Sequence, residues 1–149
     1  MSLLEKIVVG SKIRIKCSEQ EFEVLGKAVY VTRNEPDSKY IKVLLDRHHV
    51  LVIVPDEMAY FGVNKGRIPE FDAFDDMVTY QGQQLQQVNH DYQIRLSVEF
   101  GPPSEVEGNV EFWDYEDGEV IISIAELEGT KERADVVAKY IALDDIDIY

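Results

Sequence analysis

The segment NVEFWDYEDGEVIISIAELE, residues 109–128, decides the fold class. Its first part alternates between two faces, and its last part is an apolar run rich in β-branched residues. The two faces of the first part carry Val110 and Phe112 on one side and Trp113 and Tyr115 on the other. Between the two parts lies an Asp-Gly pair at 117–118, which indicates a type I′ hairpin because that turn needs positive φ at both central positions. The segment therefore predicts two antiparallel strands.

Similar alternation recurs along most of the chain and predicts further strands. We expect them in KIRIK (12–16), FEVLG (22–26), KAVYVTR (27–33), KYIKVLLD (39–46), HVLVIVPDE (49–57), YQIRLSVEF (92–100) and the terminal IDI (146–148). A turn is expected at 89–91, just before YQIRLSVEF. In the C-terminal segment 130–141, Ala134, Val137, Ala138 and Ile141 fit one helical face, whereas Val136, Ala138 and Tyr140 alternate as in a strand. The β-rich surroundings favour the strand.

These patterns predict a mainly β protein with little helix, an antiparallel sandwich or distorted barrel of about nine or ten strands. The 149 residues suit a single domain, 1–149, with halves 1–75 and 76–149 that would be related to one another. Glycines, a proline and acidic residues interrupt the alternation in the connection 61–80. One short helical turn is expected there, at 71–77.

Charge is distributed unevenly along the chain. Residues 1–75 hold 11 Lys and Arg against 12 Asp and Glu, whereas residues 76–149 hold 4 against 17, within a total net charge of −14. Such a surface repels phosphates, so neither nucleic acid nor an anionic lipid surface is an expected partner. No segment is apolar enough for membrane insertion. We read no export signal, and Cys17 is the single cysteine, which favours a cytoplasmic location.

The acidic segment around the predicted hairpin is a candidate site. An EF-hand register that starts at Asp114 fails by one residue, and nothing selects a catalytic pair of carboxylates. A solvated hairpin is the simplest interpretation, and contact with a basic protein partner is the functional one. We therefore expect a non-enzymatic binding or adaptor module. The contact residues expected are Glu105, Glu107, Glu111, Trp113, Asp114, Tyr115, Glu116 and Asp117.

An alternative hypothesis is a small-molecule-binding protein or an enzyme. Its pocket would lie under the 61–80 connection, lined by Tyr60, Phe61, Arg67, Phe71 and Phe74. Concave aromatic sites with a few polar groups are typical of such proteins. A flat acidic face with Trp113 or Tyr115 exposed would favour the adaptor, whereas a deep, enclosed pocket would favour the alternative.

Other chemistries find little support in the sequence. His48, His49 and His90 are expected in turns and share no register with carboxylates, so no metal site is predicted. Cys17 has no Cys-x-x-Cys partner, and there is no nucleophile elbow, Walker loop or dinucleotide fingerprint. We expect no catalytic residues and no cofactor, and the oligomeric state is not indicated.

Four segments resemble the uncharacterised bacterial family called domain of unknown function 4178. These segments are VGSKIRI at 9–15, YQGQQL at 80–85, EGNVEFWDYEDGEVIISIAEL at 107–127 and YIALDDIDI at 140–148, so the resemblance spans nearly the whole chain. It implies a β-rich fold without established catalytic residues, in a protein of a bacterial stress or membrane-associated system. The resemblance supplies no mechanism.

Overall fold

The computed structural model describes residues 7–8, 10–16, 19–32, 35–54, 58–100, 108–128 and 132–148, with the side chains of 32, 35–38, 91–100 and 108 excepted. These residues form eleven antiparallel strands and two short 3-10 helices, which confirms a mainly β fold with little helix. The strands are β1 Lys12–Ile15, β2 Gln20–Thr32, β3 Glu35–Leu45, β4 His49–Val54, β5 Met58–Asn64, β6 Met77–Tyr80, β7 Gln83–Phe100, β8 Gly108–Glu116, β9 Ile121–Leu127, β10 Val136–Ile141 and β11 Ile146–Ile148. The helices are η1 Pro69–Phe71 and η2 Leu143–Asp145.

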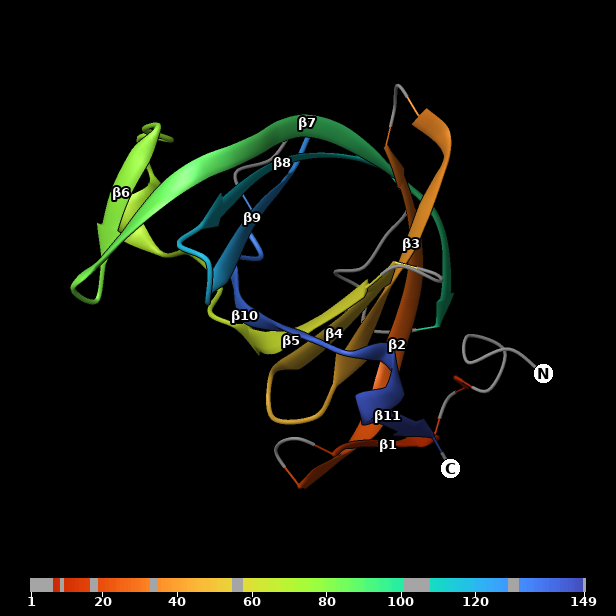
Figure 1. The fold of residues 1–149 in the computed structure, drawn as a ribbon. Coiled ribbons are helices and arrows are strands. Elements are labelled where there is room, and N and C mark those ends of the chain that lie inside the picture. The colour runs from red at the N-terminus through yellow and green to blue at the C-terminus, as the bar shows by residue number, and fades with distance from the viewer. Residues whose placement is uncertain are drawn as a thin grey trace.

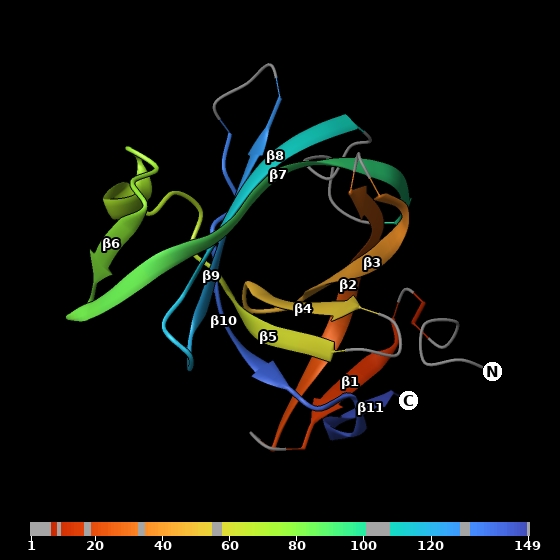
Figure 2. The same ribbon diagram turned by 45° about the horizontal axis from the view of Figure 1, so that its top comes forward.

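Eight of the strands follow one another around a common axis (Figures 1 and 2). The first half of the chain contributes the meander β2-β3-β4-β5, and the second half contributes β7-β8-β9-β10. Strand β5 pairs with β10, and β2 pairs with β7, each in antiparallel register. We call these eight strands the ring. Two register shifts interrupt the β2–β7 pairing, so the arrangement corresponds to a distorted barrel with additional strands attached.

The seam between β5 and β10 depends on a glycine. Gly62 lies opposite Ala138, and a Cβ atom on Gly62 would lie 2.0 Å from the Val137 carbonyl oxygen and 2.5 Å from the Ala138 Cα. Because these atoms belong to the backbone, they cannot turn aside as a flexible side chain would. The two backbones therefore approach closely only because position 62 has no side chain.

Each half of the ring is covered on its outside by a separate apolar cluster. The first outer cluster packs β1 and β11 against the outer face of β2 to β5, and it consists of Ile7, Ile13, Ile15, Phe22, Val24, Ile41, Val43, Leu45, Leu51, Ile53, Ala59 and Ile146. The second outer cluster packs η1 and β6 against β8 and β9, and it consists of Ile68, Phe71, Val78, Leu85, Trp113, Tyr115, Ile122 and Ile124. Several ring strands therefore bury side chains on both of their faces.

Buried ionic contacts hold the connection after β5 against the second half. The Arg133 guanidinium lies 2.5 Å from Asp135 Oδ2 and 2.6 Å from Asp72 Oδ1, and it donates to the Ile68 carbonyl at 3.1 Å. Asp135 accepts a hydrogen bond from the Ile68 N–H at 2.8 Å. Neither side chain of the Arg133–Asp135 pair is exposed. Burial raises the pKa of Asp135, although the hydrogen bond from Arg133 opposes that rise.

The turn of the predicted Asp-Gly hairpin has a different backbone geometry from the one expected. The Asp-Gly hairpin is confirmed between β8 and β9, but only Gly118 has a positive φ, at 98°. The type I′ prediction is therefore wrong: Asp117 Oδ1 instead accepts the Glu119 and Val120 N–H groups. Positive φ at two successive residues occurs between β3 and β4, at Arg47 (58°) and His48 (61°).

Several element boundaries differ from those expected. β7 runs unbroken through the turn expected at 89–91, because β8 supplies hydrogen-bond partners along this stretch and one register shift between Gln87 and Asn89 absorbs the irregularity. The expected connection 61–80 is partly strand: the end of β5 occupies 61–64, and β6 occupies 77–80. The short helical turn is at Pro69–Phe71, where proline begins it, rather than at 71–77.

The C-terminal expectations are confirmed. Val136–Ile141 is a strand, β10, and β11 is the last strand in the sheet order, paired with β1. Ile146 is buried and Ile148 packs against the first outer cluster. Within the ranges that the structure describes, no helix has the length and apolar character needed to cross a membrane.

Candidate functional site

Strand β8 presents opposite chemistry on its two faces. Trp113 and Tyr115 point outward into the second outer cluster, whereas Phe112, Asp114 and Glu116 line the interior of the ring. The predicted alternation of β8 is therefore confirmed. Its consequence differs from the solvated hairpin that we expected, because the ring turns Asp114 and Glu116 toward its own interior.

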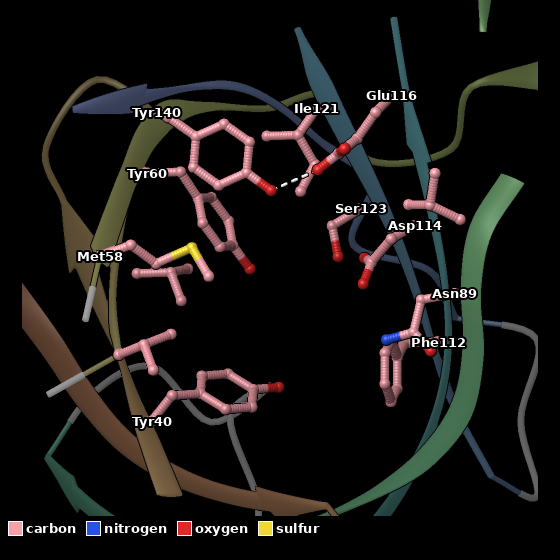
Figure 3. A pocket seen from close by; sticks show the side chains of 13 residues that line it. Tyr40, Met58, Tyr60, Asn89, Phe112, Asp114, Glu116, Ile121, Ser123 and Tyr140 are labelled. Carbon is pink, nitrogen blue, oxygen red and sulfur yellow. Dashed lines mark hydrogen bonds between the residues drawn. The ribbon is translucent and has the colours of Figure 1, made fainter. Parts of the chain in front are cut away.

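The interior contains a cavity of about 290 Å³ (Figure 3). Its first-half wall is aromatic and apolar, and its second-half wall carries most of the polar groups. We define the first-half wall as Tyr40, Val52, Val54, Met58 and Tyr60, and the second-half wall as Val88, Asn89, Phe112, Asp114, Glu116, Ile121, Ser123 and Tyr140. A smaller lobe of about 30 Å³ shares Tyr40, Tyr60 and Ser123 with this cavity, and Tyr30 and Lys42 also line it.

Asp114 is the most perturbed acid of the cavity. Burial raises its pKa to about 6, and the neighbouring charge of Glu116 adds to the rise. Hydrogen bonds with Ser123 and Asn89 act in the opposite direction, since they stabilise the carboxylate. Near neutral pH the cavity therefore holds a carboxylate that is poorly solvated and close to its titration point.

Two tyrosines of the cavity, Tyr60 and Tyr140, have raised pKa values and remain protonated. Burial is the main cause that raises the Tyr60 pKa, and the charge of Asp114 raises it further. Burial also raises the Tyr140 pKa, as does the hydrogen bond that the Tyr140 hydroxyl donates to Glu116 (Figure 3). Tyr60 hydrogen-bonds with Ser123, which in turn contacts Asp114, so one polar chain joins the two walls. Both phenols are available as hydroxyl groups rather than as phenolates.

The mouth of the cavity has an apolar rim. Among the large hydrophobic residues that the structure describes as exposed, Met58 (40%), Val88 (57%) and Tyr140 (45%) line the cavity. They come from three different strands of the ring, β5, β7 and β10. Exposed apolar side chains around a concave site are typical of a surface that binds something.

The residues expected to contact a basic partner are not gathered on one face. Trp113 is 6% exposed and stacks with Phe74 at 3.9 Å and with His90 at 4.9 Å, and Tyr115 is fully buried. Glu111 lies outside the ring, where His90 Nε2 is 2.7 Å from its Oε2. Asp117 is exposed in its turn. Glu105 and Glu107 lie outside the described residues.

The five residues of the alternative pocket lie in four different environments. Tyr60 lines the cavity, whereas Phe61 packs against Phe22 in the first outer cluster. Phe71 and Phe74 belong to the second outer cluster, and Arg67 donates to Asp72 at 2.9 Å. The connection thus covers an apolar cluster, and the cavity is on the other side of β8 and β9.

The sequence patterns do not identify several of the cavity residues. They predict a turn at Asn89, and they do not indicate a site role for Tyr40, Met58, Ser123 or Tyr140. A signal existed for Ser123, because it lies opposite Asp114 in the β8–β9 register that the hairpin fixes. No comparable sequence signal links Ser123 or Asp114 to Tyr60, because the β5–β10 pairing is not evident in the sequence.

Metal-binding geometry is not found in the part of the chain that the structure describes. No group of three or more His, Cys, Asp or Glu side chains gathers there. His48 and His49 lie in or next to the first-half hairpin turn, and His90 is engaged with Glu111 and Trp113. Cys17 lies outside the described residues.

Comparison of the chain with protein-family models, with curated proteins and with solved structures gives no match. The resemblance to the domain of unknown function 4178 therefore remains a prediction, and the function has to be argued from the cavity itself.

Proposed function

We propose that this protein binds a small molecule in the cavity inside the ring. The observation that carries the proposal is the convergence of hydroxyl, amide and carboxylate groups from six strands, β3, β5, β7, β8, β9 and β10, on one space whose remaining lining is apolar. Ligand sites are usually concave and mainly apolar, with a few polar groups that fix the orientation of the ligand. An eight-stranded barrel is wide enough to hold one small ligand.

The energetics of Asp114 support a functional role. A carboxylate whose pKa is raised by burial costs folding free energy at neutral pH, and an apolar residue at the same inward position would avoid that cost. Groups perturbed in this way are concentrated at binding and catalytic sites. The position is therefore better explained by what enters the cavity than by stability.

The burial of Trp113 and Tyr115 favours the cavity over the acidic adaptor. An adaptor face would need these aromatic residues at the surface between the acids, yet both support β8 from behind. The acids on the inward face of β8 are directed to a small ligand rather than to a protein surface. Contact with a basic protein is not needed to account for the inward-facing acids.

A blocked mouth tests the proposal. We would screen small neutral, anionic and cationic fragments by saturation-transfer NMR against the native protein, Val88→Trp and Met77→Trp. Val88 stands at the rim, whereas Met77 is an equally apolar, exposed residue on β6 outside the cavity lining. Fragments that bind the native protein and Met77→Trp but not a folded Val88→Trp would support the proposal. No bound fragment, or binding that Val88→Trp leaves unchanged, would overturn it.

A further inference from the structure

We propose that the ligand of this cavity is a small organic ammonium ion, held between the tyrosines and the carboxylates Asp114 and Glu116. This inference rests on the proposed function and adds the chemical class of the ligand. The cavity, its charge, its aromatic lining and its apolar rim each support it.

The charge of the cavity is the first argument. Asp114 and Glu116 are two residues apart on the inward face of β8, which places their Cα atoms about 7 Å apart. Among the described residues that line the main cavity there is no Lys, Arg or His. Lys42 lines only the smaller lobe and is not among the groups that shift the pKa of Asp114. A ligand with a positive charge would stabilise both carboxylates, whereas an anion would meet like charge in a poorly solvated space.

The aromatic lining is the second argument. Tyr40, Tyr60 and Tyr140 approach the cavity from β3, β5 and β10, and the hydroxyl groups of Tyr40 and Tyr60 point into it (Figure 3). Tyrosine rings attract a cation that lies over their faces, and most strongly where water is excluded. Their oxygens also accept hydrogen bonds from N–H donors. Aromatic rings combined with carboxylates suit an ammonium group better than an inorganic cation, which needs several oxygen ligands at once.

Size and rim are the third argument. A volume of about 290 Å³ lies at the small end of the range for ligand sites, so the ligand is a small ion rather than an extended one. Met58 and Val88 at the mouth offer apolar contact to alkyl carbons. A charged nitrogen directed inward, with a short alkyl part toward the rim, satisfies both regions.

A matched pair of probes isolates the charge. Choline and 3,3-dimethylbutan-1-ol have the same shape and differ in one atom, nitrogen against carbon, and choline carries a charge that does not titrate. n-Butylammonium and n-butanol form a second pair that adds N–H donors. By isothermal titration calorimetry at pH 7.5, we expect choline to bind ten or more times more tightly than 3,3-dimethylbutan-1-ol, and n-butylammonium to bind more tightly than n-butanol.

Two substitutions on β8 then locate the charge effect. Asp114→Asn should weaken binding of the ammonium probe about tenfold or more and leave its neutral partner unaffected. Glu111→Gln removes a carboxylate from the outward face of the same strand, where it pairs with His90, and should leave both affinities unchanged. Equal affinity for ammonium and neutral probes, preference for the neutral probes, or no loss in Asp114→Asn would overturn the inference.

The two proposals fail in different ways. If neither ammonium probe binds while neutral or anionic fragments bind the native protein and Met77→Trp but not Val88→Trp, the cavity is a ligand site and only the ammonium assignment is wrong. If no neutral, anionic or cationic fragment binds the native protein and loses its binding in Val88→Trp, the proposed function itself is wrong.

The pH dependence of choline binding provides a further readout. The groups that face Asp114 are Glu116 on its own strand, Asn89 on β7, Ser123 on β9, Tyr60 on β5 and Tyr140 on β10. Because the tyrosines stay protonated, the affinity for choline should be constant above about pH 7. It should fall as Asp114 takes up a proton near pH 6, and Asp114→Asn should abolish this step. A native profile identical to that of the variant would contradict the role of Asp114.

Discussion

The two halves of the ring share a topology and differ in chemistry. Each contributes a four-stranded antiparallel meander, and each is covered on its outer face by short flanking elements. The first-half wall brings Tyr40, Met58 and Tyr60 to the cavity, whereas the second-half wall brings Asp114 and Glu116 together with an amide and a hydroxyl. Neither half alone contains the site, which exists only where the aromatic wall faces the acidic one.

The outer covers differ as well. The first outer cluster consists mainly of aliphatic side chains from β1, β11 and the ring. The second depends on aromatic stacking and on a buried ion pair, with Phe74 against Trp113 and Arg133 against Asp135. The strand that carries the acids is thus supported from behind by large, rigid groups.

Loss of the buried cation should affect the second half most strongly. Arg133→Ala leaves Asp135 as an unpaired charge and the Ile68 carbonyl without its donor, so we expect the free energy of unfolding to fall by about 3–5 kcal/mol in urea titrations. Arg67→Ala is the control. Arg67 bonds the same Asp72 but is exposed, and its loss should cost under about 1 kcal/mol. An equal loss of unfolding free energy in the two variants would show that burial of the Arg133–Asp135 pair does not determine its contribution to stability.

The seam between the halves should tolerate no side chain at position 62. Gly62→Ala places a Cβ atom against the backbone of β10, and we expect a loss of about 3 kcal/mol together with reduced hydrogen-exchange protection in β5 and β10. Gly118→Ala, at a site with open space around it but positive φ, should cost only about 1 kcal/mol. If the two variants were equally stable, the close approach at the seam would not be real.

Removal of the acid from the second-half wall should stabilise the protein. The pKa of Asp114 is about 6 in the folded state and 3.8 in an ordinary aspartate, so the folded protein holds this proton more tightly than the unfolded chain does. The carboxylate therefore lowers stability at neutral pH, and this cost disappears as the pH falls from about 6 to about 4. We expect Asp114→Asn to raise the free energy of unfolding by about 3 kcal/mol at pH 7.

Urea titrations across this pH range provide the check. The difference between Asp114→Asn and the native protein should be greatest near pH 7 and should vanish near pH 4. A variant that is less stable than the native protein at pH 7 would mean that the carboxylate is stabilised by its neighbours and not destabilised by burial.

The two hairpins should respond to substitution in opposite directions. His48 is exposed and has a positive φ, so His48→Gly should relieve backbone strain and stabilise the first-half hairpin by about 1 kcal/mol. The same thermal-denaturation assay should show a loss of similar size for Gly118→Ala in the second-half hairpin. A destabilised His48→Gly would show that the side chain contributes more than its backbone conformation costs.

Local patterning was enough to predict much of the fold. The alternation in β1, the β8–β9 hairpin and the terminal strand β11 all follow from short-range periodicity. β5 was missed because its run Met58–Asn64 follows a proline and contains a glycine, both of which weaken a strand signal. The continuity of β7 was missed because an Asn-His-Asp run favours turns when no partner strand is known.

The site was harder to predict, and the reason is physical. Alternation on β8 distinguishes two faces, and the usual assumption assigns the acidic face to water. In a ring with outer covers that assumption fails, because Trp113 and Tyr115 are buried outside and Asp114 faces inside. Recognising this requires the β2–β7 and β5–β10 pairings, which join residues far apart in the chain and leave no local signal.

The most direct test of the account is an NMR titration of the Asp114 side-chain carboxyl ¹³C resonance, assigned with Asp114→Asn and recorded with and without saturating choline. The account predicts a midpoint at about pH 6 in the free protein, which moves to lower pH when choline occupies the cavity. A midpoint near that of an ordinary aspartate, about pH 4, unchanged by choline, would contradict it, because Asp114 would then face water rather than a ligand cavity.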